Sequence, residues 1–268
     1  MRKLSGLSLL ALAAASLARL ASTSPPQASL MVGIEPAAPS ATNVHLMTTA
    51  PFTSTNLVEF PAKLASMTRR PGSLIFSFTG GFDDGGNLYH LLENGNFIMA
   101  GPTGFDACPA LVWDESGFFL WGTVCNFAGD CLVQLDAQTG AATLVGESDL
   151  IGVEALSIDP TDGTLYGTTG FHYDGSPGDI FTFDKATGEG TDTGFDLLDT
   201  FGNPPPCTVA GMSFSANGVG YVSIGCGVLG PGSGEVFSFD TTTFTLTPLG
   251  DATAGGNGGS MSDLAVIF

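Results

Sequence analysis

The stretch VEALSIDPTDGTLYG, residues 153–167, reads as a strand, a tight turn and a second strand. The chain then repeats this pattern. DESG, residues 114–117, stands between ALVW and FFLWG, and SANG, residues 215–218, stands between AGMSF and VGYVS. Alternating strands joined by Gly, Asp and Asn are typical of β-hairpins. A hairpin that recurs along the chain predicts a repeat protein.

A longer unit can be aligned around these hairpins, in four copies that cover residues 64–106, 107–152, 153–206 and 207–260. In each copy the hairpin is followed by a third strand, such as CLVQLDAQTG, and by a fourth strand that ends near a glycine, such as ATLVG. Successive units of four antiparallel strands are typical of the blades of a β-propeller.

The two ends of the chain complete a further unit. The last eight residues, MSDLAVIF, match only the first strand of a blade, while residues 28–35, 43–52 and 55–60 match the second, third and fourth strands. Pairing of these ends would remove the exposed sheet edges. We therefore predict an all-β fold, a single β-propeller of five four-stranded blades over residues 28–268, closed by one composite blade. An open or truncated array is the alternative.

The first residues are predicted to form a signal peptide, residues 1–18, because a basic start precedes an apolar run that is short for a membrane span. Residues 19–27 are expected to be a disordered segment. We expect the protein to be exported to the periplasm, the extracellular space or the cell surface, without a membrane span after cleavage. An uncleaved anchor is the alternative.

The chain carries a net charge of −19, and after Arg70 its only basic residue is Lys185. Such a surface repels phosphate backbones, so we expect no nucleic-acid partner. It would attract divalent cations or basic partners. The alternative is that the charge serves only solubility in a salty or calcium-rich medium.

Five cysteines suit an exported protein. Cys207 and Cys226 are symmetric about one predicted turn, and Cys108 and Cys125 are symmetric about another, so each hairpin would place its two cysteines opposite each other. We predict disulfides 207–226 and 108–125, which leave Cys131 outside a disulfide. The alternative is a 125–131 bond. No Cys and His spacing indicates zinc.

The strand ending LYG, followed by FDxxTG, resembles the repeats of secreted bacterial β-propellers of the NHL and YVTN kind. The matching stretches are LVQLDAQTGAATLVG, residues 132–146, and IFTFDKATGEGTDTG, residues 180–194. This resemblance covers most of residues 28–268, and it implies a fold rather than an activity. The recurring Asp136, Asp184 and Asp240 are predicted to cap hairpin turns.

In a propeller the first strands line the central channel, and the loops between blades share one face with the loops between second and third strands. The latter loops include GGFDDGGN and GFHYDGSPGD. We predict ligand binding by the aromatic and imidazole side chains of these loops: Phe82, Phe171, His172 and Tyr173. A calcium site is a further hypothesis, at Asp83, Asp84 and Asp174, because Ca²⁺ takes oxygen ligands. The interblade Asp106, Asp149 and Asp199 would add further carboxylates to the same face. The alternative is that these aspartates are solvated turn residues.

Two carboxylates stand near the start of first strands, Glu154 and Asp263. A glycosidase needs two carboxyl groups at a defined separation, so these residues are the candidates if the protein is a hydrolase or lyase. Trp113 and Trp121 are expected to pack in the core rather than to bind sugar. We predict an exported binding module for a glycan, a peptide or a surface component, with no certain cofactor. A hydrolase and a structural surface protein are the alternatives.

Overall fold

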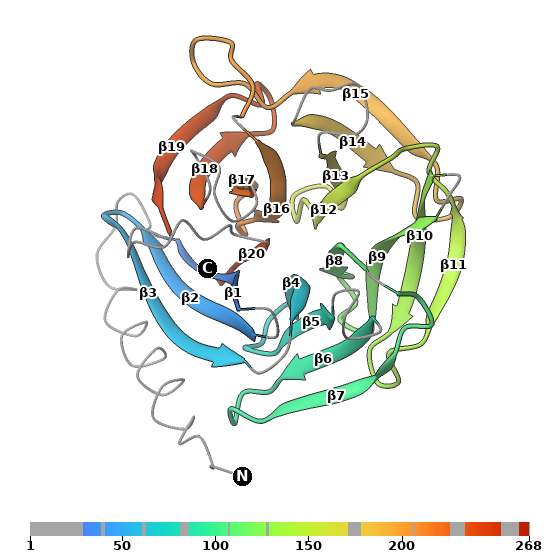
Figure 1. Cartoon of the computed structure of the whole chain (residues 1–268). Helices are drawn as coiled ribbons and strands as arrows, with labels where there is room; N and C mark the ends of the chain where they lie inside the picture. Colours follow the sequence, from blue (N-terminus) through green and yellow to red (C-terminus); the bar gives the residue numbers. More distant parts are fainter. Residues whose placement is uncertain are drawn as a thin grey trace.

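The computed structural model describes residues 29–38, 41–60, 63–80, 86–106, 108–126, 129–170, 178–205, 207–225, 234–252 and 263–267. These residues form five sheets of four antiparallel strands each, arranged around a common axis (Figure 1). The predicted five-bladed β-propeller is therefore confirmed. In the described part of the chain, no helix is long and apolar enough to cross a membrane.

Each blade contributes one strand to each of four concentric positions. The innermost strands are β4 (Leu64–Arg69), β8 (Ala110–Trp113), β12 (Val153–Ile158), β16 (Thr208–Phe214) and β20 (Asp263–Val266). The second strands are β1 (Leu30–Ala38), β5 (Phe76–Gly80), β9 (Phe119–Asn126), β13 (Leu165–Thr169) and β17 (Val219–Gly225). The third strands are β2 (Ala41–Thr49), β6 (Asn87–Leu91), β10 (Gly129–Asp136), β14 (Asp179–Phe183) and β18 (Glu235–Asp240). The outermost strands are β3 (Phe52–Phe60), β7 (Phe97–Pro102), β11 (Ala142–Glu147), β15 (Gly190–Asp196) and β19 (Leu246–Asp251).

The composite blade closes the ring as predicted. Strand β20 pairs antiparallel with β1, from Met31 opposite Val266 to Ile34 opposite Asp263. The full order of this sheet is β20-β1-β2-β3, so one strand comes from the end of the chain and three come from its beginning. Inner strands of neighbouring blades also lie side by side around the axis, in the order β4, β8, β12, β16 and β20 (Figure 1).

The hydrophobic core lies between the blades, in five clusters of buried side chains. Successive residues of a strand point to opposite faces of its sheet, and both faces of a blade are covered by neighbours. This is why the inner strands are buried almost throughout. Trp113 and Trp121 are 4% and 6% exposed, which confirms that they are core residues.

The glycine near the end of the fourth strand has a packing reason. A side chain at Gly101 would collide with the backbone carbonyl of Thr139, and one at Gly146 would collide with that of Thr187. Both threonines belong to the xxTG motif of the following blade. The two repeated motifs are therefore the two sides of one close backbone contact between neighbouring blades.

The repeated hairpin phrase forms the turns of one face of the ring, which we call the hairpin face. A backbone hydrogen bond closes each turn, from Gly117 N–H to Asp114 and from Gly163 N–H to Asp159. Gly117, Gly163 and Gly218 have φ angles of 69°, 78° and 79°. This left-handed region favours glycine because other residues meet a Cβ clash there.

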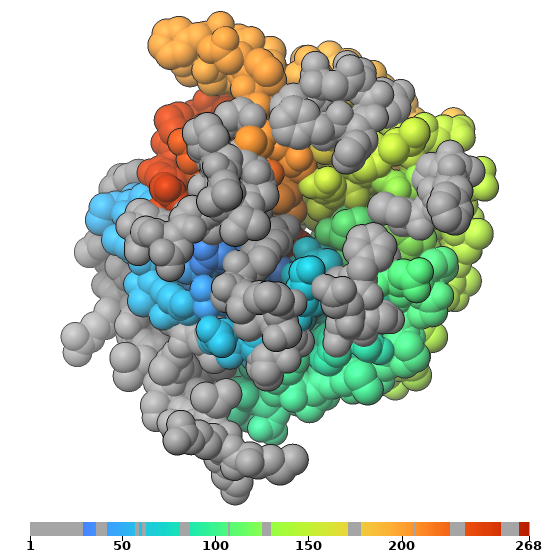
Figure 2. Space-filling model, in the orientation of Figure 1, coloured from blue at the N-terminus to red at the C-terminus, as the bar shows by residue number. Residues whose placement is uncertain are grey.

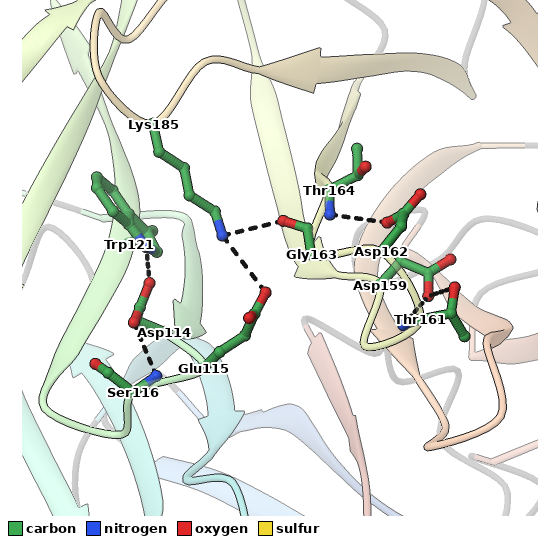
Figure 3. A network of polar contacts seen from close by, with 10 residues as sticks. All are labelled: Asp114, Glu115, Ser116, Trp121, Asp159, Thr161, Asp162, Gly163, Thr164 and Lys185. Carbon is green, nitrogen blue, oxygen red and sulfur yellow. Dashed lines mark hydrogen bonds and ion pairs between the residues drawn. The ribbon is translucent and has the colours of Figure 1, made fainter.

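Neighbouring turns of the hairpin face are joined by polar contacts (Figure 3). The ammonium of Lys185 donates to the carbonyl oxygen of Gly163 at 3.1 Å and lies 3.7 Å from a carboxylate oxygen of Glu115. The indole N–H of Trp121 donates to Asp114 at 2.9 Å. The carboxylates drawn on this face therefore hold the hairpins together and have partners within the protein.

The predicted 108–125 disulfide is wrong. Cys108 keeps a buried thiol, which donates a hydrogen bond to the carbonyl oxygen of Ala110 at 3.3 Å. The ladder between β8 and β9 ends at Ala110, and the sulfur of Cys108 lies against the space that a side chain at Gly122 would need. Cys131 is also a buried thiol, so the alternative 125–131 bond is not formed either.

The 207–226 disulfide stays a prediction, because Cys226 lies outside the described residues. The last described pair between β16 and β17 is Thr208 opposite Gly225. Cys207 stands directly before Thr208, at the edge of this described ladder.

Candidate functional site

The opposite face of the ring, which we call the mouth face, carries the starts of the inner strands, the loops between blades and the loops between second and third strands. Several predicted site residues belong to loops outside the described residues: Phe82, Asp83, Asp84, Phe171, His172, Tyr173 and Asp174. Their roles stay predictions. Glu154 and Asp263 are described, and so are the interblade aspartates.

Glu154 is the second residue of β12 and is partly buried at the mouth face. Its carboxyl lies against the backbone of Gly170, where an added Cβ would be 2.7 Å from Oε1. The methyl group of Thr208, from the next blade, is 3.1 Å from the same point. None of the described residues donates a hydrogen bond to this carboxyl. It is therefore a polar group in a narrow space that the described residues leave without a hydrogen-bond donor.

The pKa of Glu154 is raised from 4.5 to about 7. Burial is the larger cause, because it disfavours the charged carboxylate, and the nearby negative charge of Asp130 adds to it. Functional sites typically contain carboxyl groups of this kind, which change charge near neutral pH and are partly open to solvent.

Asp130 is the second residue of β10 and was not predicted. It is 2% exposed, and its Oδ2 accepts the N–H of Val153 at 2.5 Å. It thus ties its blade to the start of the next one, directly beside Glu154. The sequence did contain a signal: Asp130 stands where three other blades have Gly86, Gly178 and Gly234, and all four backbone carbonyls accept a hydrogen bond from the residue that follows the outermost strand of the same blade.

Asp263 lies in a different environment from Glu154. It is 3% exposed, Oδ2 accepts the N–H of Met67 at 2.7 Å and Oδ1 accepts the N–H of Leu264 at 2.7 Å. Burial raises the pKa of Asp263 well above its ordinary value, although these two hydrogen bonds act in the opposite direction. Strand β16 stands between β12 and β20 in the ring, and its Gly211 leaves room for Asp263. The structure therefore places Asp263 as an interblade tie.

The recurring turn aspartates do what the sequence predicts. Oδ1 of Asp136 accepts the N–H groups of Gln138 and Thr139, both at 2.8 Å. Oδ1 of Asp184 accepts the backbone N–H of Ala186 at 2.7 Å. Oδ1 of Asp240 likewise accepts a backbone N–H of its own turn at 2.7 Å. These hydrogen bonds hold the pKa of Asp136 and Asp240 below the ordinary range.

The interblade aspartates on the mouth face lie at the surface, and Asp106 and Asp149 are exposed. Asp199 belongs to the segment between β15 and β16, which projects from the rim of the ring (Figure 2). Its carboxylate accepts the N–H groups of Phe201 and Asn203 at 2.8 Å, so it stabilises a turn. Among the described residues, no group of three or more His, Cys, Asp and Glu could hold a metal ion.

Comparison with known proteins shows the fold and no more. No protein-family model matches the sequence, and no curated protein matches it. A chain from the crystal structure of a nidogen/laminin complex is similar over 90% of this chain and 98% of that chain, with a TM-score of 0.61 and 9% identity. TolB from Acinetobacter baumannii is similar over 83% of this chain, with a TM-score of 0.52 and 16% identity. The chain spans about half of that TolB chain, 53%.

Proposed function

We propose that this protein is an exported binding module that recognises its ligand at the mouth face, with Glu154 as the anchoring group. The observation that carries the proposal is the carboxyl of Glu154, which lies partly buried against Gly170 and has no hydrogen-bond donor among the described residues. A buried carboxyl without a partner is unfavourable, so a ligand that supplies a donor gains affinity there.

The chemistry of this position favours a basic ligand group. Asp130 adds a second negative charge, and the chain as a whole carries −19. An ammonium or guanidinium group would stabilise the ionised form of Glu154 and would be attracted from a distance by the acidic surface. We therefore infer a peptide or a protein surface with exposed Lys or Arg as the ligand class. The similar chain in the nidogen/laminin complex also comes from a protein assembly.

An array of synthetic peptides with and without Lys and Arg, together with a glycan array, tests this proposal. We expect the wild-type protein to retain basic peptides, and Glu154→Gln to weaken their binding at least roughly tenfold, as loss of a charged hydrogen bond does. Glu189→Gln makes the same charge change at an exposed turn of the hairpin face and should bind like the wild type. Equal binding by all three proteins would refute the role of Glu154.

The pH dependence gives a second readout. A cation binds the ionised carboxylate, so affinity should rise as the pH passes through about 7, the pKa of Glu154. The loop that follows Gly170 contains the predicted aromatic contacts Phe171 and Tyr173, and their replacement by Ala should also weaken retention. Retention that neither change affects would argue against this loop.

Calcium remains a separate proposal for Asp83, Asp84 and Asp174. A ligand that binds only the folded state raises stability, by about 2.7 kcal/mol at a hundredfold excess over its dissociation constant. We expect a rise in melting temperature in millimolar Ca²⁺, relative to EDTA, that Mg²⁺ does not reproduce and that Asp83→Asn removes. An unchanged melt would leave these residues as turn aspartates.

A hydrolase or lyase is the second candidate, because a carboxyl with a pKa of about 7 suits proton transfer. The structure supports it less, since Asp263 already accepts two backbone hydrogen bonds and is buried. Loss of turnover of a polysaccharide in both Glu154→Gln and Asp263→Asn, with folding intact, would support an enzyme. Absence of turnover across a broad panel would favour the binding module or a structural protein.

A further inference from the structure

The composite blade carries a Ser–His–Glu cluster away from the mouth carboxyls. Glu35 lies on β1, His45 on β2 and Ser54 on β3. Nε2 of His45 is 2.7 Å from Oε2 of Glu35, and Nδ1 of His45 is 3.3 Å from Oγ of Ser54. The imidazole therefore bridges a carboxylate and a hydroxyl across three adjacent strands.

The strand register explains how these side chains meet. His45 lies opposite Gly33, which has no side chain to block the imidazole. Glu35 is two residues beyond Gly33 and therefore on the same face of the sheet. On the other side, His45 lies opposite Asn56, and Ser54 is two residues from Asn56. All three side chains of the cluster thus share one face of the blade.

The hydrogen bonds determine the proton positions. The hydrogen bond from His45 lowers the pKa of Glu35, so this carboxylate is ionised and can only accept. Nε2 of His45 must then carry the proton that it donates to Glu35. In the neutral imidazole Nδ1 is an acceptor, and the hydroxyl of Ser54 must be the donor. A serine that donates to an imidazole oriented by a carboxylate is the arrangement of an activated nucleophile.

A second Ser–His pair in the molecule provides an internal comparison. Nδ1 of His90 is 2.8 Å from Oγ of Ser77, and its Nε2 is 2.6 Å from the carbonyl oxygen of Ala137. Here the third group is a neutral carbonyl, and Ser77 is 0% exposed. Ser54 differs in both respects, because it is partly exposed and its histidine is held by a carboxylate.

We propose that Ser54 is a nucleophile for carboxylic esters, with His45 as its general base and Glu35 as the positioning residue. Oγ of Ser54 bonds to the ester carbonyl carbon while Nδ1 of His45 takes the hydroxyl proton. The tetrahedral intermediate then expels the alcohol, which leaves with the proton from Nδ1. Water hydrolyses the acyl-serine by the same steps and releases the carboxylic acid. The Nδ1–Oγ distance of 3.3 Å is at the long end for such a pair, as is common before substrate binds.

A fluorophosphonate probe with peptide mapping by mass spectrometry tests the proposal, since it reports the first covalent step alone. We expect labelling of the folded protein at Ser54 and not at Ser77. Ser54→Ala should abolish labelling, whereas Ser116→Ala, at an exposed hairpin turn, should leave its rate unchanged. His45→Gln should slow it by about a hundredfold, the usual contribution of a general base.

The role of Glu35 has its own readout. Glu35→Gln should slow labelling by at least roughly tenfold and shift the Nε2–H proton resonance of His45 upfield, because the acceptor loses its charge. Labelling no faster than that of the heat-denatured protein, or equal rates in the wild type and a folded His45→Gln variant, would overturn the proposal. Neither result would affect peptide binding at Glu154, because that test uses other residues.

Discussion

Replacement of Glu154 by Gln should change how stability depends on pH. In the folded protein the pKa of Glu154 is raised from 4.5 to about 7. Between these values the unfolded chain has lost the proton that the folded protein still holds. Stability must therefore fall as the pH rises through this interval, and the group contributes no further change above it. Gln cannot ionise, so the variant lacks this loss.

The size of the effect follows from the two pKa values. A difference of about 2.5 pH units, at about 1.4 kcal/mol each, corresponds to roughly 3 kcal/mol. We expect the free energy of unfolding of Glu154→Gln, relative to the wild type, to increase by this amount between about pH 4 and about pH 8. Asp263 also has a raised pKa, but its contribution is the same in both proteins and cancels in the comparison.

Urea unfolding of both proteins across this pH range, monitored by tryptophan fluorescence, measures the difference. Glu189→Gln serves as the control for removal of one negative charge, and its stability should follow that of the wild type at every pH. If the curves of Glu154→Gln and the wild type run parallel, the carboxyl is hydrated and ionises normally. Both the burial argument and the anchoring role of Glu154 would then fail.

Two further predictions concern the fold. Gly146→Ala should destabilise the protein by about 2 to 4 kcal/mol in urea unfolding, because the added Cβ collides with a backbone carbonyl of the next blade. The control Gly202→Ala, at a φ of 83° with open space around it, should lose only about 1 kcal/mol. Equal losses in the two variants would contradict the close-contact explanation. Alkylation and peptide mapping without reductant should find Cys207 linked to Cys226. Cys108 should be alkylated only after unfolding. A disulfide at Cys108 would contradict the buried thiol that the structure shows there.

The architecture could be predicted because its signals are local. Strand alternation, the turn glycines and the aspartates of the xxTG hairpins each depend on a few consecutive residues. The composite blade could be predicted because the ends of the chain contain complementary parts of one repeated unit. Asp136, Asp184 and Asp240 were interpreted correctly for the same reason, since a turn aspartate bonds to its own turn.

The candidate site was predictable only in part. Glu154 stands out as an acid at the start of an inner strand, but its raised pKa depends first on its burial between blades and then on the charge of Asp130 from the preceding blade. The predicted disulfide of Cys108 was wrong although the hairpin is symmetric about its turn. The ladder between β8 and β9 ends at Ala110, two residues before it would reach Cys108. Periodicity cannot show where a ladder stops.

The number of blades, the order of their strands and the way in which the ring closes could all be predicted from the amino-acid sequence, because they follow from short patterns repeated along one chain. The folded structure was needed to show which side chains influence one another: Asp130 acts on the charge of Glu154, and His45 hydrogen-bonds to both Glu35 and Ser54. Contacts of this kind join different strands or different blades. They depend on bulges, on the ends of ladders and on how closely two backbones approach, and none of these is a property of a local stretch of residues.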